Sequence, residues 1–243
     1  MNLTRFCAVG DNHGNLIHRA DAEAFQEFCA DFKPQLRVHL GDNWDFANLR
    51  RGADPREEGD DMGPDLDAGF EFLKTFRPNV MTLGNHDHRL WRAMTDSRGL
   101  VRKFASDTVA EIERVAAKIK CKLLPYHSRQ GIHSVGKLSF LHGYHAGLGA
   151  IAQHARTYRS CIFGHLHCNG SVTERGLDVP TAYCVGGLGD HERMEYAAQR
   201  TATLAWGPGW AYGVINPRTG NFQSWIAQKM DGRWMLPSGI TET

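Results

Sequence analysis

The sequence contains no apolar run long enough to cross a membrane, since a spanning helix needs roughly 20 consecutive apolar residues. Its 243 residues are 42% hydrophobic and 23% charged, which is the composition of an ordinary globular protein. The apolar part of the opening stretch MNLTRFCAVG is also too short for a secretory signal. We therefore expect an intracellular, cytoplasmic protein that has no membrane partner.

A strong net charge is also absent. The formal net charge of +1 gives no general attraction to nucleic acid or acidic membranes, although it is compatible with a local basic patch. No two of the six cysteines form a CxxC pair, which argues against a zinc ribbon. Cys7, Cys161 and Cys184 fall in apolar runs, where a free thiol behaves as a small buried side chain. A reducing compartment fits this pattern better than a disulfide framework does.

The first part of the chain alternates strand-like and helix-like segments. Apolar runs at residues 5–10, 36–42 and 79–85 predict strands, and the periodicity of residues 20–32 and 65–76 predicts helices. This order is typical of a parallel α/β arrangement, in which ligands bind at the carboxyl ends of the strands. Each of the three predicted strands ends in polar residues.

The rest of the chain predicts one charged helical segment and a series of strands. Residues 88–120 have amphipathic helical spacing and resemble an insertion or cap. Later apolar runs predict strands, with a helix near residues 147–158 and antiparallel hairpins towards the C-terminus. Because no linker-like stretch interrupts the motif region, we expect residues 1–243 to form a single domain.

Metal-ligating residue types occupy the ends of the predicted strands. They occur in the motifs GDNHG, GDNWD, GNHD, LHGYH and GHLH, which contain Asp11, His13, Asp42, Asp45, Asn85, His86, Asp87, His142, His165 and His167. Carboxylate and amide oxygens suit hard cations, and transition metals also accept imidazole. Alternation along a strand would place both ligands of DxH, or of HxH, on one side. One such motif alone is a weak signal, but five in this order at strand ends are specific.

In this order the motifs resemble those of the calcineurin-like metallophosphoesterase superfamily, and the whole chain is similar to compact phosphoesterases encoded by phages and prophages. The resemblance implies an α/β fold, namely a four-layer αββα sandwich of two mixed β-sheets. It also implies two divalent metal ions. Manganese is the first expectation for both, and iron, zinc or nickel are alternatives.

Carried over by motif, the resemblance implies a role for each residue. The first metal ion would be bound by Asp11, His13, Asp42 and His167. The second would be bound by Asp42, Asn85, His142 and His165. His86 would be the catalytic histidine, Asp45 would orient it, and Asp87 would support the turn. The substrate would be contacted by Asn85, His86 and Arg89.

The implied activity is hydrolysis of a phosphoester by a hydroxide that bridges the two metal ions. Phe46 stands where the protein-phosphatase branch of the superfamily has an arginine, and GNHD stands in place of GNHE. We therefore favour a phosphodiesterase that acts on a nucleotide or nucleic acid. A phosphomonoesterase, including a protein phosphatase, is an alternative, and a non-catalytic scaffold of the same fold is another.

Several further residues have two interpretations. His145 can contact the phosphate or belong to a supporting loop. The basic residues after GNHD can grip a longer substrate or form a solvated helix face; they are Arg89, Arg92, Arg98, Arg102 and Lys103. The loop around His191 can close over the site. Three late aromatic residues can stack on a base or pack in the core, namely Trp206, Trp210 and Tyr212.

Overall fold

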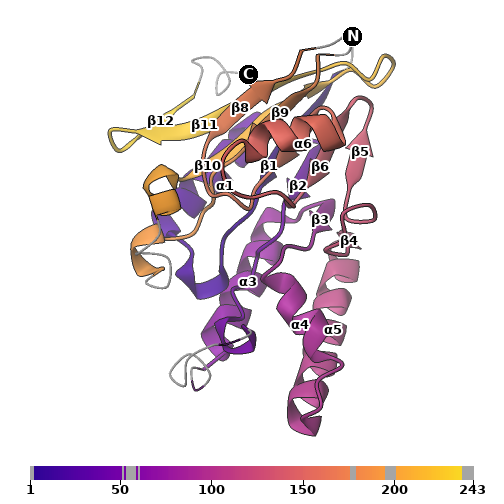
Figure 1. Cartoon of the computed structure of the whole chain (residues 1–243), viewed down its shortest axis with the longest axis vertical. Helices are drawn as coiled ribbons and strands as arrows, with labels where there is room; N and C mark the ends of the chain where they lie inside the picture. The colour runs from indigo at the N-terminus through magenta and orange to yellow at the C-terminus, as the bar shows by residue number, and fades with distance from the viewer. Residues whose placement is uncertain are drawn as a thin grey trace.

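Two mixed β-sheets lie face to face at the centre of the molecule (Figure 1). The computed structural model describes residues 3–50, 52, 59, 61–175, 179–194 and 201–236. One sheet has seven strands in the order β12-β11-β10-β1-β2-β3-β4, and the other has five in the order β5-β6-β7-β9-β8. Both sheets contribute to one apolar core, in which the rings of Phe6 and Phe140 lie 5.4 Å apart in an edge-to-face contact.

The strands of each sheet run in mixed directions. The larger sheet contains β1 (Thr4–Val9), β2 (Leu36–His39), β3 (Val80–Thr82), β4 (Lys122–Leu124), β10 (Gly209–Ile215), β11 (Phe222–Met230) and β12 (Arg233–Met235). The smaller contains β5 (His133–Val135), β6 (Leu138–Leu141), β7 (Cys161–Phe163), β8 (Gly170–Thr173) and β9 (Thr181–Cys184). Strands β1 to β4 are parallel, whereas β10, β11 and β12 pair antiparallel. The predicted parallel start and the predicted C-terminal hairpins are therefore confirmed.

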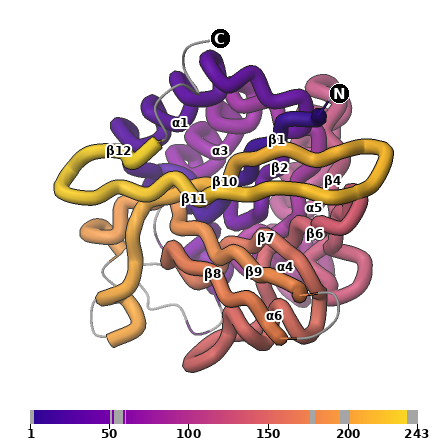
Figure 2. Tube along the Cα trace, turned by 90° about the horizontal axis from the view of Figure 1, so that it is seen from above, coloured from indigo at the N-terminus to yellow at the C-terminus, as the bar shows by residue number. Residues whose placement is uncertain are grey.

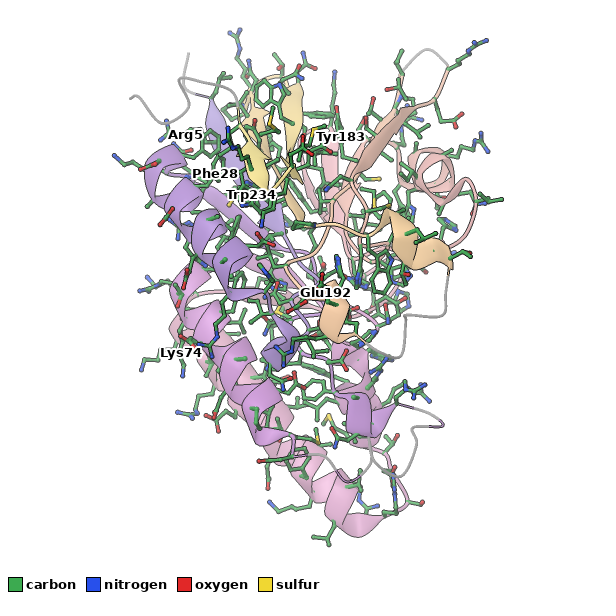
Figure 3. The ribbon with its side chains drawn as sticks, turned by 90° about the vertical axis from the view of Figure 1, so that its left-hand side faces the viewer. Arg5, Phe28, Lys74, Tyr183, Glu192 and Trp234 are labelled. Carbon is green, nitrogen blue, oxygen red and sulfur yellow. The ribbon has the colours of Figure 1, made fainter. Side chains whose placement is uncertain are left out.

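Helices cover the outer faces of both sheets (Figure 2). Helices α1 (Arg19–Phe32) and α3 (Gly63–Phe76) lie on the larger sheet, where Phe25, Phe28 and Phe72 pack against Trp210. Figure 3 shows Phe28 beside Trp234 of β12, at the margin of this cluster. Helix α6 (Ala150–Tyr158) covers the smaller sheet through a separate cluster. The succession of helices, sheet, sheet and helix confirms the predicted four-layer sandwich.

Both long helices of the first layer end in the same way. Their last turns are closed by Lys33 and Arg77, which have left-handed backbone with φ of 49° and 51°. Pro34 and Pro78 follow directly, and proline cannot continue a helix. The chain therefore turns back at the same end of the layer twice, and it delivers β2 and β3 parallel to β1.

The segment of residues 88–120 contains two helices. Helix α4 (Asp87–Ala93) begins within the GNHD motif, and α5 (Gly99–Lys118) follows after a short turn. Helix α5 buries Val109 and Ile112 in a core shared with α3 and α4, and one end of it extends beyond the sheets (Figure 1). Among the described residues, no helix has both the length and the apolar character that crossing a membrane requires.

Two short strands escaped the sequence prediction: β5 and β8. Each lies at the edge of its sheet, and each has only three or four residues. Their side chains are exposed or half-buried, so they form no buried apolar run. Edge strands of this kind are defined by backbone pairing with a neighbour, which residue periodicity does not report.

Candidate metal centre

The predicted ligands meet at one end of the two sheets, beyond the carboxyl ends of five strands. The larger sheet contributes the segments after β1, β2 and β3, and the smaller sheet contributes those after β6 and β7. Among the described residues, possible ligating atoms form three groups in which all atoms lie within 4.8 Å of one another; one of them joins His13 to Asp45 and His86, and the other two consist of predicted ligands. Of these two, the first contains Asp11, His13 and His167, and the second contains Asp42, His142 and His165.

The expected reason for this convergence is wrong in one respect. Alternation along strands was to place Asp11 beside His13 and His165 beside His167, but all four residues lie beyond the strand ends. Their backbone is left-handed, with φ of 53°, 53°, 67° and 54° in that order. Left-handed backbone is uncommon for residues other than glycine, although Asn, Asp and His tolerate it best. Tight loops therefore bring each pair together, and strand geometry does not.

A hydrogen bond to Asp45 orients His13 within the first group. His13 Nδ1 lies 2.9 Å from Asp45 Oδ1, and because a carboxylate can only accept, the imidazole donates through Nδ1. Its Nε2 therefore points away from Asp45, and this atom lies 3.2 Å from Nε2 of His167. Asp11 Oδ1 lies 3.4 Å from the same His167 nitrogen. These three donor atoms point at one another inside the protein, with the three side chains buried.

The second group has the same construction. His142 Nδ1 donates to the carbonyl of Leu40 at 2.9 Å, which directs its Nε2 at the other members of the group. That Nε2 lies 3.0 Å from Asn85 Oδ1 and 3.3 Å from Asp42 Oδ2. Burial opposes a charge on this imidazole, but the Asp42 carboxylate raises the pKa of His142 to about 9. Burial lowers the pKa of the neighbouring His165 to about 4.

The spacing of the donor atoms fits divalent cations. Two ligands bound about 2.1 Å from one ion lie about 3.0–3.4 Å apart at tetrahedral or octahedral angles. The four nitrogen and oxygen separations given above run from 3.0 to 3.4 Å. Each of the two oriented imidazoles, His13 and His142, donates its other N–H to an oxygen, as metal-bound histidines usually do. The residues present can therefore hold two metal ions, and the donor set suits manganese, iron, zinc or nickel.

Asp45 connects the first group with His86. Its Oδ1 accepts a hydrogen bond from His86 Nδ1 at 2.7 Å, in addition to the one from His13. Burial opposes the charge of Asp45, but these two hydrogen bonds hold its pKa well below the usual range. Arg89 reaches the other side of the His86 ring, with NH2 3.3 Å from Nε2, and its NH1 donates to the Asp45 carbonyl at 2.8 Å. Asp45, His86 and Arg89 therefore form one connected group beside the ligands.

Two further carboxylates hold the loops that carry this group. Asp87 accepts backbone N–H groups from Asp42, Asn43, Trp44 and Gly84 at 2.8–3.1 Å. This geometry agrees with the supporting role expected for Asp87. Sequence reasoning missed Asp65 in α3, whose carboxylate accepts the N–H groups of Asp45 and Phe46 at 3.0 and 2.9 Å. An acidic residue in the first turn of a helix is ordinary in a sequence, so no pattern marks Asp65 as part of the site.

Glycines in the motifs leave room for the carboxylates. A side chain at Gly84 would place its Cβ 2.0 Å from Asp42 Oδ1. At Gly164 the Cβ would lie 2.2 Å from Asp11 Oδ2. Both distances are far below van der Waals contact, so a side chain at either position would displace the carboxylate of the neighbouring ligand.

The remaining candidates divide between the site and the rest of the protein. Trp210 and Tyr212 are buried against α1, which excludes them from stacking on a base. His145 contacts Thr157 Oγ1 at 3.1 Å, in keeping with a loop role. Two others lie over the first group: the ring centroids of Trp206 and His191 are 4.4 and 5.5 Å from that of His167. His191 lies in the short helix η3 (His191–Arg193), whose Glu192 marks this end of the sheets in Figure 3.

Comparisons with known proteins find similar folds. No protein-family model matches the sequence, and no curated protein matches it. A metallophosphoesterase from Sphaerobacter thermophilus is 16% identical, and the match covers 93% of this chain and 89% of that one, with a TM-score of 0.49. Vacuolar protein sorting 29 from Cryptosporidium parvum is 13% identical, with 96% and 95% covered and a TM-score of 0.46. A phosphatase from Mycoplasma pneumoniae is 13% identical, with 94% of each chain covered and a TM-score of 0.45. These similarities concern the fold, and the two-sheet topology of this chain is the one that its motifs predict.

Proposed function

We propose that this protein hydrolyses phosphoesters with two divalent metal ions, and that its substrate is a phosphodiester of a nucleotide or nucleic acid. The observation that carries the proposal is the pair of donor groups with separations of 3.0–3.4 Å. In this proposal Asp11, His13 and His167 hold one ion, Asn85, His142 and His165 hold the other, and Asp42 is shared. Two bound cations would polarise the phosphoryl oxygens and make a water molecule acidic at neutral pH.

His86 and Arg89 are placed to act on the substrate. Because His86 donates to Asp45 through Nδ1, its Nε2 faces outwards and meets the guanidinium of Arg89 at 3.3 Å. A phosphate at this position would offer acceptors to Arg89, whose planar group suits phosphate oxygens. The Nε2 of His86 would then be released to hold or deliver a proton at the leaving oxygen. Asn85 would contribute its amide beside the same phosphate.

The choice of a diester rests on the residue after GDNWD. A protein phosphatase of this superfamily would have an arginine there, but Phe46 is fully buried and stacks near Trp44, with ring centroids 5.9 Å apart. The position therefore provides no cation for a terminal phosphate. The basic side chains instead follow His86 on α4, where they can contact the flanking part of a longer substrate.

A manganese-loaded activity panel tests this proposal. It compares a phosphomonoester, bis(p-nitrophenyl) phosphate, cyclic nucleotides, and single- and double-stranded DNA. We expect diester hydrolysis that Asp42→Asn abolishes while the protein stays folded, because the variant loses the shared carboxylate. The matched control, Asp107→Asn, alters an exposed residue of α5 that pairs with Lys103 and should keep full activity. Turnover of the Asp42 variant near the wild-type rate contradicts the metal assignment, and hydrolysis of the monoester alone contradicts the choice of a diester.

A further inference from the structure

A cavity of about 490 Å³ opens next to the candidate centre and is lined mainly by arginines. Four arginines line it, namely Arg50, Arg89, Arg92 and Arg98. The acidic residue in its wall is Asp96, and the Asp96 carboxylate is already bound by Nε and NH2 of Arg98 at 3.0 and 3.1 Å. Among the described residues that line the cavity, arginines therefore outnumber acidic residues, although the net charge of the whole chain is only +1.

Arg89 joins this cavity to the catalytic group. Its side chain is half-buried and lines the cavity, while its guanidinium contacts both His86 Nε2 and the Asp45 carbonyl. The inner end of the cavity is therefore the place where the proposed reacting phosphate meets His86. A substrate that extends from this phosphate in the direction of α4 enters the cavity.

Arg92 lies one helical turn further along the same face of α4. Residues three apart in a helix have Cβ atoms about 5–6 Å apart, which is comparable to the spacing of adjacent phosphates along a nucleic-acid strand. Arg92 is exposed and lines the cavity, and among the described residues none forms a hydrogen bond or ion pair with its guanidinium. A cation in this position is accessible to a phosphate that enters the cavity.

From these observations we infer that the arginine-lined cavity binds a second phosphate of the substrate, next to the one that is cleaved. The inference rests on the proposed function and narrows it: the preferred substrate is a single strand of nucleic acid with consecutive phosphodiesters. Arg89 holds the scissile phosphate, and Arg92 holds its neighbour. Bis(p-nitrophenyl) phosphate has no second phosphate and makes no use of the cavity.

The test compares Arg92→Gln with Arg218→Gln. Arg218 is exposed in the turn between β10 and β11, which lies at the opposite end of the molecule from α4 (Figure 1), so this control removes the same charge elsewhere. With manganese bound, Arg92→Gln should lower kcat/KM about tenfold for a short oligothymidylate, because one charge-assisted contact is lost. It should change kcat/KM for bis(p-nitrophenyl) phosphate by less than about twofold. Arg218→Gln should leave both values unchanged, and Arg92→Lys should restore part of the loss.

Binding is measured separately from turnover. Fluorescence anisotropy with a labelled oligothymidylate, in the presence of a chelator, should show about tenfold weaker binding for Arg92→Gln. The slope of log affinity against log salt should fall by about 0.7 in that variant, as expected for one phosphate contact to a single strand. Equal effects of Arg92→Gln and Arg218→Gln in this assay overturn the inference. If the wild type hydrolyses no diester but the binding difference holds, the proposed function fails and the anion site stands.

Discussion

Replacing Asp45 by alanine should weaken metal binding as well as turnover. The motif resemblance links Asp45 to His86 alone, and on that basis only turnover would fall. In the structure one oxygen of Asp45 accepts hydrogen bonds from His13 Nδ1 at 2.9 Å and from His86 Nδ1 at 2.7 Å. Because His13 is a proposed ligand, the loss of this oxygen removes the contact that aims its Nε2 at the metal.

The size of the effect follows from the two hydrogen bonds. A hydrogen bond to a charged group contributes about 1.5–3 kcal/mol, and removing the partner that orients a metal ligand costs about 10–100-fold in affinity or activity. We therefore expect Asp45→Ala to bind manganese about 10–100-fold more weakly. At saturating manganese its kcat should still be at least about tenfold low, because His86 is no longer oriented. Asp45→Asn keeps an oxygen acceptor and loses only the charge, so both effects should be intermediate.

Isothermal titration of manganese into chelator-stripped protein measures the affinity, and steady-state hydrolysis at saturating manganese measures kcat. Urea unfolding of each variant verifies that the fold is retained. Asp107→Asn on the exposed face of α5 serves as the control for the loss of a carboxylate. If Asp45→Ala binds manganese as tightly as the wild type, Asp45 does not orient His13, and the assignment of His13 to the first metal ion loses its main support.

Three other substitutions test the environment of the site. Gly164→Ala should lower manganese affinity at least about tenfold, because the new Cβ displaces Asp11. The control is Gly207→Ala, whose Cβ would have no atom within 4 Å and which should bind manganese normally. Titration of manganese into both variants measures the difference, and equal affinities contradict the prediction. Burial lowers the pKa of His154 to about 4, below its ordinary value of about 6.5. The unfolded chain therefore gains a proton at this histidine before the folded protein does. The free energy of unfolding should fall by up to about 3 kcal/mol as the pH drops from about 6.5 towards 4. Urea unfolding across this range should show a shallower pH dependence for His154→Gln, and an unchanged slope contradicts the assignment. With metal ions removed by a chelator, His167→Val should be about 1 kcal/mol less stable to unfolding than His167→Asn. The backbone of His167 is left-handed, and a β-branched residue tolerates that conformation worse than asparagine does. Equal stability of the two variants contradicts the claim that this backbone is strained.

Much of the candidate centre could be predicted because the motifs sit where the fold needs them. Parallel strands with connecting helices bring their carboxyl ends to one edge, so Asp11, Asp42 and Asn85 had to lie near one another. The smaller sheet was harder to infer, since its strands are short, yet LHGYH and GHLH still end apolar runs. His142 and His165 were therefore placed correctly at the ends of β6 and β7.

The details that the sequence could not predict depend on contacts between distant residues. Asp65 and Asp45 are 20 residues apart, and no local pattern links them. Trp206 and Trp210 belong to the same aromatic stretch, but one lies over His167 and the other is fully buried in the core. Only the path of the chain into β10 separates their environments. The left-handed loops were missed for a related reason, because strand alternation explains the same DxH spacing equally well.

The construction of the centre itself favours cation binding over a purely structural role. Of the twelve non-glycine residues with positive φ in the part of the chain that the structure describes, five are proposed ligands: Asp11, His13, Asp42, His165 and His167. Left-handed backbone costs roughly 1–2 kcal/mol per residue, so the loops concentrate strain of about 5–10 kcal/mol at one point. The same loops bury two carboxylates and bring imidazole nitrogens together, with Nε2 of His13 and Nε2 of His167 3.2 Å apart. This strain does not stabilise the fold. A divalent cation between these atoms would be attracted by the buried carboxylates and would offset the cost of the strained loops, and this is the physical reason to expect metal binding here.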